Sequence, residues 1–266
     1  MARTYVVTGS ASGIGATTAR LLAERGERVI GVDLRNADVE ADLSVSEGRA
    51  AAVTRIIDLA GGTVDAVIAC AGITAPTPKT VSVNYFGVTE LLTGLLPALT
   101  TSEAPRAAVV SSVGSLHPNS PELVEAMLSD DEARALEVAA SLAAQGPQSG
   151  ALLYQSSKRA IARWVRRESI TPAWAGAGIP LNAVAPATVT TPLTAELLAT
   201  PEGVAMLDAA VPMPLNYHQP PESIAYLLIW LTSPENTHLA GQVIYDDGGA
   251  DVSLRGDDIW SWNDRD

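Results

Sequence analysis

A glycine-rich turn follows the first β-rich run of the chain. That run covers residues 5–8, and the segment TGSASGIG covers residues 8–15 and opens a helical stretch. Gly9, Gly13 and Gly15 let the backbone turn tightly and approach a ligand, while free N–H groups at the start of a helix face an anion. The pattern predicts a binding site for the pyrophosphate group of a dinucleotide.

An acidic residue stands where such a site needs one. Asp33 ends the second β-rich run, residues 28–33, 18 residues after Gly15. A carboxylate there accepts the hydroxyl groups of the adenosine ribose and repels a 2′-phosphate. The sequence therefore predicts NAD rather than NADP, although the neighbouring Arg35 leaves some use of NADP open.

Short apolar runs alternate with longer helical stretches along the whole chain of 266 residues. Strands written as near-continuous apolar runs, with helices between them, indicate a parallel sheet covered on both faces. No repeat or linker divides the chain, so we expect one α/β domain over residues 1–266, a Rossmann-type doubly wound parallel sheet. The expected strands are residues 5–8, 28–33, 64–69, 107–111, 181–185 and 242–245, with a stub of strand near residue 42, and the expected helices are residues 46–59, 81–99, 154–174 and 221–231.

Residues 113–153 interrupt this alternation. Pro121 suits the first position of a helix, and Ser129 with Glu132 forms a capping-box pattern ahead of a second helix to about residue 144. We therefore expect a small helical insertion at the edge of the main fold, just before a tyrosine of chemical interest.

That tyrosine and a lysine share one helix face. Tyr154 and Lys158 are four residues apart, and the chain holds only one other lysine, Lys79. A free tyrosine has a pKa of about 10 and is a poor base at neutral pH, but a nearby cation favours its phenolate form. Such a pair can exchange a proton with an alcohol or carbonyl oxygen while a hydride moves to or from a nicotinamide.

With these motifs the chain resembles the short-chain dehydrogenase/reductase superfamily in its single-domain form. The likeness spans the whole chain, and its motifs occur in the family's order. The matching segments are TGSASGIG at 8–15, Cys70-Ala71-Gly72 in place of Asn-Ala-Gly, Asn84 in VSVNYFG, Ser112 in VVSSVG, YQSSK at 154–158, and PATVTTP at 186–192 with Ala187 where glycine is usual.

Within that family the chain is most similar to bacterial 3α-hydroxysteroid dehydrogenases/carbonyl reductases. Three features carry this likeness: the short stretch VDLRNADVEADLS at 32–44, the Cys-Ala-Gly variant, and VSVNYFGVTELL at 81–92. The long insertion before the tyrosine is also a property of this subgroup.

The resemblance implies four catalytic residues. Tyr154 would be the general acid/base, and Lys158 would lower its pKa and bind the nicotinamide ribose. Ser112 would hold the substrate oxygen, since alternation along a strand lets only one of Ser111 and Ser112 face the site. Asn84 would keep a water-linked proton path open at a helix kink, although a purely structural role is the alternative.

The resemblance also implies a set of cofactor contacts. Asp42 and Leu43 match positions beside the adenine, and Thr188 and Thr191 match positions near the carboxamide. The full expected set is Gly9, Ser12, Gly13, Ile14, Gly15, Asp33, Asp42, Leu43, Cys70, Ala71, Gly72, Tyr154, Lys158, Pro186, Thr188 and Thr191.

An apolar segment, residues 193–220, follows the last motif and is expected to cover the substrate. Ser112, Tyr154, Leu193 and Met213 are the predicted substrate contacts. The composition supports an apolar alcohol or ketone. The family likeness suggests steroids or bulky cyclic ketones, while terpene-like or other alicyclic alcohols remain open. A dinucleotide-binding sensor without catalysis is the alternative of a different class.

The charge balance limits the other partners. The net charge is −13, which disfavours nucleic acid and anionic membranes. We interpret the one basic cluster, Arg159, Arg163, Arg166 and Arg167, as a solvated helix face. The three histidines have no metal-ligand spacing, so no metal site is predicted.

Location and assembly can also be predicted. No signal peptide or membrane span is visible, and the single cysteine, Cys70, favours a reducing compartment, so we expect a cytoplasmic protein. We interpret the Cys70 side chain as small and buried. The insertion lies near the helices through which simple family members form tetramers, so a homodimer through another face is expected. The tail, residues 257–266 with Trp260 and Trp262, is either disordered or packed on a neighbouring subunit.

Overall fold

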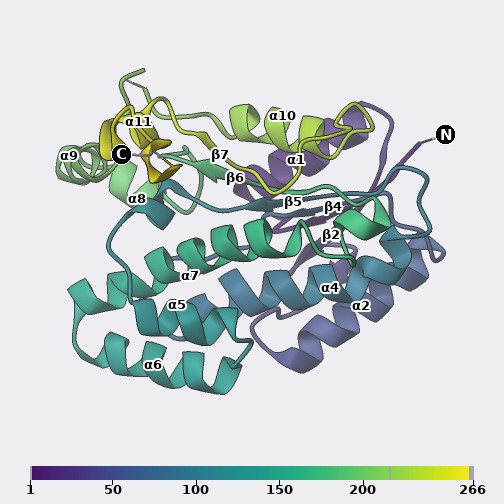
Figure 1. The fold of residues 1–266 in the computed structure, drawn as a ribbon, viewed down its shortest axis with the longest axis horizontal. Coiled ribbons are helices and arrows are strands. Elements are labelled where there is room, and N and C mark those ends of the chain that lie inside the picture. The colour runs from purple at the N-terminus through teal and green to yellow at the C-terminus, as the bar shows by residue number, and fades with distance from the viewer. Residues whose placement is uncertain (1, 216, 264–266) are drawn as a thin grey trace.

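A parallel β-sheet forms the centre of the protein. The computed structural model describes residues 2–215 and 217–263, and within them seven strands lie in the order β3-β2-β1-β4-β5-β6-β7 (Figure 1). All neighbouring strands pair in parallel. The chain winds outward from β1 in both directions, so the predicted doubly wound α/β fold is confirmed. The strands are β1 (Thr4–Thr8), β2 (Arg28–Asp33), β3 (Val39–Glu40), β4 (Ala66–Ala69), β5 (Arg106–Val110), β6 (Leu181–Pro186) and β7 (Val243–Asp246).

Helices cover both faces of the sheet. Alternate strand residues divide the core: Tyr5 and Val7 face α1 and α10, whereas Val6 and Val67 face the opposite helical layer. In Figure 1, α1 and α10 lie on one side of the sheet and α2, α4 and α7 on the other. The helices are α1 (Gly13–Glu24), α2 (Ser46–Ala60), α3 (Lys79–Val81), the π-helical η1 (Ser82–Phe86), α4 (Gly87–Leu99), η2 (Val113–Leu116), α5 (Pro121–Leu128), α6 (Glu132–Ala144), α7 (Pro147–Glu168), η3 (Ala175–Ala177), α8 (Ala195–Leu198), α9 (Pro201–Ala210), α10 (Pro221–Leu231), α11 (Ala250–Arg255) and η4 (Ser261–Asn263).

The insertion is helical as predicted, with different boundaries. Helix α7 begins at Pro147, so the last residues of the expected insertion belong to the helix that carries Tyr154. The cap of α6 is Asp131, whose side chain accepts a hydrogen bond from the Arg134 N–H, and the predicted Ser129 cap is wrong. Helix α7 ends at Glu168 rather than near residue 174, because Pro172 disfavours the helical conformation of the residue before it.

Helices α5 and α6 form a further layer beneath α7 (Figure 1). Their buried side chains, including Leu123 and Met127, belong to the same core cluster as Tyr85 and Phe86 of η1. The insertion is therefore part of the main core.

A buried ionic contact joins this layer to helices α2 and α4 of the main fold. Arg49 of α2 is only 1% exposed, and its Nε lies 2.9 Å from Glu90 Oε2 of α4. Its Nη2 lies 2.5 Å from Oε2 of Glu132, the first residue of α6. The Arg49 guanidinium also lies 6.0 Å from the Phe86 ring centre. Burial raises the pKa of Glu90, and the Arg49 cation opposes that rise.

The basic cluster on α7 pairs with local acceptors. Arg163 lies 2.6 Å from Glu125, and Arg167 lies 2.8 Å from Glu168. The interpretation as a solvated, ion-paired helix face is confirmed for these residues. Among the described residues, no helix has both the length and the apolar character needed to cross a membrane.

Replacing Arg49 tests the contact between the insertion and the core. We expect Arg49→Ala to lower the free energy of unfolding by about 3 kcal/mol, because two partly buried carboxylates lose their cation. Arg134→Ala, which removes exposed ion pairs with Glu122 and Glu137, should leave the urea midpoint nearly unchanged. Equal effects of the two substitutions would contradict this account.

Candidate active site

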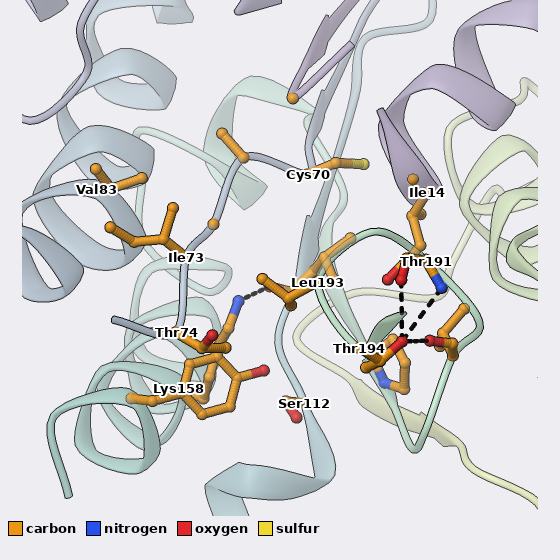
Figure 2. A pocket seen from close by; sticks show the side chains of 18 of the residues that line it. Ile14, Cys70, Ile73, Thr74, Val83, Ser112, Lys158, Thr191, Leu193 and Thr194 are labelled. Carbon is orange, nitrogen blue, oxygen red and sulfur yellow. Dashed lines mark hydrogen bonds between the residues drawn. The ribbon is translucent and has the colours of Figure 1, made fainter. Parts of the chain in front are cut away.

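A cavity of about 710 Å³ lies at the carboxyl ends of the strands, where the winding direction of the sheet reverses. Open α/β sheets bind their ligands at this position. Figure 2 shows Cys70, Ser112, Lys158, Thr191 and Leu193 around the cavity. Of the predicted residues, those that line it are Gly9, Ser12, Gly13, Ile14, Gly15, Asp33, Asp42, Leu43, Cys70, Ala71, Gly72, Ser112, Tyr154, Lys158, Pro186, Thr188, Thr191 and Leu193.

The glycine turn forms one wall of this cavity. Gly9 has φ of +67°, which favours glycine, and a Cβ on Gly15 would lie 2.2 Å from the Gly9 carbonyl oxygen. Ser12 is the N-cap of α1, yet its side chain makes no capping bond and the first turn holds no acidic residue. The first N–H groups of α1 are thus available to an anion in the cavity.

Asp33 lies at the adjacent strand end and is already oriented by the backbone. Its carboxylate accepts hydrogen bonds from the N–H groups of Ala11, at 3.0 Å, and Leu34, at 2.7 Å. The first bond ties it to the glycine turn. Arg35, the residue that left NADP open, does not line the cavity.

Asp42 is held by a network at the same end of the cavity. Its Oδ1 accepts hydrogen bonds from the N–H and hydroxyl of Ser44, and its Oδ2 lies 3.3 Å from Lys79 Nζ. These bonds lower the pKa of Asp42, with Ser44 as the largest cause. Lys79, one of the two lysines of the chain, also lines the cavity, although no sequence motif assigns it a role.

Ser112 and Tyr154 meet at the other end. Ser112 caps η2, where its Oγ accepts a hydrogen bond from the Gly114 N–H at 3.0 Å. A Cβ on Gly114 would lie 3.4 Å from Ser112 Oγ and 3.0 Å from the Tyr154 ring, so the two side chains lie close together. Ser111 is buried, and its hydroxyl donates to the Lys158 carbonyl at 3.1 Å. The geometry therefore favours Ser112 over Ser111 as the group available to a ligand.

Lys158 extends from α7 to the end of β5. Its Nζ donates to the Val110 carbonyl at 2.8 Å and lies 5.8 Å from the Tyr154 ring centre. Burial lowers the pKa of Lys158 to about 8. The neighbouring Cys70 thiol is half-buried, and burial raises its pKa to about 12, so it remains a thiol at neutral pH.

The expected low pKa of Tyr154 is wrong for this structure. Burial raises the pKa of the phenol, and the neighbouring Ser112 side chain opposes that rise. The Lys158 Nζ lies 5.8 Å from the centre of the Tyr154 ring. The same amine donates a hydrogen bond to the Val110 carbonyl. Without a bound ligand, Tyr154 is therefore a proton donor at neutral pH.

Asn84 lies at a helix kink as expected, but it does not line the cavity. Its Oδ1 accepts from the Ile73 N–H at 2.9 Å, and its Nδ2 donates to the Ile73 carbonyl and to Ser157 Oγ. A Cβ on Gly72 would lie 3.3 Å from Asn84 Oδ1 and 3.5 Å from Lys158 Nζ. The structure thus shows Asn84 fixing the loop after β4 beside the lysine, with both of its N–H groups occupied.

The predicted cover, residues 193–220, contributes α8 and α9. Leu193, Leu197, Leu207 and Val211 line the cavity, so its wall is apolar here. Met213 does not line it, and this predicted contact is wrong. After α9 the chain turns toward the loop beyond β7, where the Met213 side chain lies against Gly248.

The alanine that replaces the family's glycine fits without strain. Ala187 is not among the residues with positive φ, so its side chain is tolerated. Its N–H donates to Gln219 Oε1, and Gln219 Nε2 donates to the Asp246 carbonyl at 2.9 Å. Sequence analysis assigned no role to Thr74, His117 and Gln155, which also line the cavity. Isolated polar residues such as these carry no spacing signal that could identify them.

The described part of the chain holds no group of three or more His, Cys, Asp or Glu side chains that could bind a metal ion. The tail residues Trp260 and Trp262 are exposed in this single chain, and residues 264–266 of the predicted tail lie outside the described residues.

The two lysines allow the shifted pKa to be measured. We expect the side-chain NMR signal of Lys158 in isotope-labelled protein to titrate near pH 8, with Lys158→Met providing the assignment. Between about pH 8 and the ordinary value of 10.5, the unfolded chain holds this proton and the folded protein does not. Stability should therefore rise with pH in that window relative to Lys158→Met. A titration at the ordinary value would contradict the burial of the amine.

Comparison with known proteins gives consistent matches. A family model described as enoyl-(acyl carrier protein) reductase matches residues 9–251. The chain is 37% identical to a 3-alpha-hydroxysteroid dehydrogenase/carbonyl reductase of Comamonas testosteroni, over 94% of this chain and 97% of that protein. It is 31% identical to a cis-4-hydroxycyclohexanecarboxylate dehydrogenase of Sinomonas cyclohexanicum, over 93% and 96%. A crystal structure of 3-alpha-hydroxysteroid dehydrogenase from Pseudomonas sp. B-0831, complexed with NADH, matches with a TM-score of 0.88 and 41% identity, over 96% and 100%.

Proposed function

Because the chain belongs to the short-chain dehydrogenase/reductase family, we propose that it is an NAD(H)-dependent oxidoreductase that interconverts a secondary alcohol and a ketone on an apolar, cyclic substrate. One observation carries this proposal: Ser112, Tyr154 and the buried Lys158 line the same cavity as the glycine turn.

The residues of the cavity fit a nicotinamide dinucleotide. The uncapped N–H groups of α1 suit a pyrophosphate, and the Asp33 carboxylate suits ribose hydroxyl groups. Lys158 would hold the second ribose, while Thr188 and Thr191 would contact the carboxamide. When bound, the nicotinamide supplies a hydride acceptor or donor. These site assignments are part of the proposal.

The protein side chains manage the proton and the substrate oxygen. Ser112 donates a hydrogen bond to the substrate oxygen and keeps it beside Tyr154. In reduction, the Tyr154 phenol gives its proton to that oxygen. In oxidation, the phenolate takes the alcohol proton, and the Lys158 cation stabilises it. Asn84 acts as a positioning residue because it fixes the loop beside Lys158.

The apolar wall of α8 and α9 supports the substrate class. Leu197, Leu207 and Val211 present only hydrocarbon to the cavity. By their names, the two relatives described above act on a 3-alpha-hydroxysteroid and on cis-4-hydroxycyclohexanecarboxylate. We therefore propose a steroid-like or other bulky cyclic ketone, and the same wall suits terpene-like or other alicyclic alcohols.

Assembly and location complete the proposal. Helices α5 and α6 cover one side of α7, so we propose a homodimer through another face. Tyr226 and Trp230, one turn apart on α10, are exposed large aromatic residues and mark a candidate face. We propose the cytoplasm as the location. NAD(H) is available there, and its reducing conditions suit the free thiol of Cys70.

Replacing the tyrosine tests the chemical step. We expect Tyr154→Phe to lower kcat by about 10²–10⁴-fold, because the proton donor is lost, while NADH affinity changes little. Tyr245→Phe is the matched control, since the Tyr245 hydroxyl bonds to Ser115 away from the cavity lining. Turnover should be followed by nicotinamide absorbance with cyclic ketones. Retained activity in Tyr154→Phe would overturn the role of Tyr154. Absence of activity in the native enzyme with every ketone and alcohol would favour the non-catalytic sensor.

Replacing the ribose-binding carboxylate tests cofactor selection. We expect Asp33→Asn to lower the ratio of kcat/KM for NAD to that for NADP at least about 10-fold, since the charge that repels a 2′-phosphate is lost. Asp38→Asn is a fitting control: its carboxylate accepts from the Gly31 N–H nearby but does not line the cavity. An unchanged ratio in Asp33→Asn would show that Asp33 does not select the cofactor.

A further inference from the structure

Lys79 is a cation at the cavity that the proposed chemistry does not use. Its side chain is 47% exposed, and among the described residues that line the cavity only Lys79 and Lys158 are lysine or arginine. Its Nζ lies 3.3 Å from Asp42 Oδ2, and in the described part of the chain this is the one ion pair formed between two lining residues. An exposed pair of this kind adds little to the stability of a fold, so any larger effect would be on a ligand in the cavity.

The pair lies at the end of the cavity where the Asp33 carboxylate suits the adenosine ribose. Strand β3 pairs with β2, and the Ala41 N–H donates to the Asp33 carbonyl at 2.9 Å, so Asp42 follows directly beside the ribose site. An acidic residue at the position of Asp33 bonds the ribose hydroxyl groups in dinucleotide sites. The base carried by that ribose is therefore within reach of Asp42, and the catalytic groups lie at the other end.

The two partners come from segments on either side of the cofactor site. Asp42 follows β3, whereas Lys79 is the first residue of α3 and follows β4. In the strand order β3-β2-β1-β4, these segments flank the ends of β2 and β1, which carry Asp33 and the glycine turn.

Both segments are fixed locally. Asp42 accepts two hydrogen bonds from Ser44, and the buried Thr80, next to Lys79, donates its hydroxyl to the Ala75 carbonyl. The ion pair thus links two rigid segments that flank one binding site.

The charges favour a role in holding a dinucleotide. The Ser44 hydrogen bonds and, less strongly, Lys79 hold the pKa of Asp42 below its usual range, so this carboxylate is charged at neutral pH. With Asp33 close by and a net charge of −13 on the chain, an anionic cofactor is repelled here unless a cation offsets the carboxylates. Lys79 supplies that cation. Because it is paired with Asp42, it is poorly suited to bind a 2′-phosphate.

Building on the proposed function, we propose that Lys79 is a further cofactor-binding residue, which pairs with Asp42 to close the adenine end of the cavity and retain the adenosine half of NAD(H). The pair has to open when the cofactor leaves, so it slows cofactor dissociation. Lys79 takes no part in hydride or proton transfer.

The rate at which NADH dissociates tests this role. Lys79→Met keeps the length of the side chain and removes its charge, and we expect NADH to leave about 2–5-fold faster, as measured by stopped-flow fluorescence. Lys79→Arg keeps the cation and should restore most of the difference. Arg163→Met, which removes an exposed ion pair with Glu125 outside the cavity lining, is the matched control and should leave the rate unchanged.

Two further measurements separate this role from a general structural effect. ADP-ribose contains the adenosine half of the cofactor without the nicotinamide, and its affinity, measured by calorimetry, should fall by the same factor in Lys79→Met. In the background of Asp42→Asn, Lys79→Met should add no further change, because the two residues act as a pair. Melting temperature reports whether Lys79→Met is folded, and Lys79→Gln supplies a second neutral variant if it is not.

The outcomes distinguish this inference from the proposed function. Equal NADH dissociation rates in the native protein and Lys79→Met, or an unchanged affinity for ADP-ribose, would overturn the role of Lys79. A loss of affinity confined to NADPH would overturn it as well, because Lys79 would then serve a 2′-phosphate. These binding measurements need no turnover. A native protein that binds NADH but interconverts no alcohol and ketone would contradict the proposed function and leave the role of Lys79 standing.

Discussion

The hydrogen bond from Lys158 Nζ to the Val110 carbonyl joins the two halves of the proposed active site. It anchors a buried cation from α7 at the carboxyl end of β5, on the central part of the sheet. Ser111 reinforces the same junction by bonding the Lys158 carbonyl. Because the lysine is fixed, Tyr154, one helical turn earlier, is held within reach of Ser112. Asn84 completes the arrangement from the other side by fixing the loop beside Gly72.

This arrangement depends on the sheet around it. Parallel strands bring their carboxyl ends to one edge, and the reversal of winding between β1 and β4 opens a cavity there. The insertion supports α7 from the outside, with Arg49 joining α6 to α2 and α4. The catalytic helix is therefore packed on both sides, which suits a site that must hold a charged amine away from water.

The sequence was sufficient to predict the fold and most of the cavity. The bounds of β2 and α10 agree with the predicted ranges, because apolar runs with clear stops define them. The glycine turn and the Tyr154–Lys158 pair also line the cavity as expected. Such features are local: they depend on spacing along one strand or one helix.

Several of the errors depend on contacts between elements that are distant in the sequence. Met213 belongs to the apolar cover, but a turn after α9 directs it to Gly248. The pKa of Tyr154 depends on burial by several elements, and no spacing reveals that. Asp131 rather than Ser129 caps α6, since both residues suit a cap and only the packing decides. His117 and Lys79 are single polar residues whose places at the cavity follow from the tertiary fold alone.

Transfer of a labelled hydride tests the central claim most directly. The native protein should be incubated with NAD and a cyclic secondary alcohol that carries deuterium on the carbinol carbon, and the reduced cofactor analysed by mass spectrometry. The account predicts NADH with one deuterium per molecule, formed together with the ketone. Reduced cofactor without deuterium, or ketone without reduced cofactor, would contradict it.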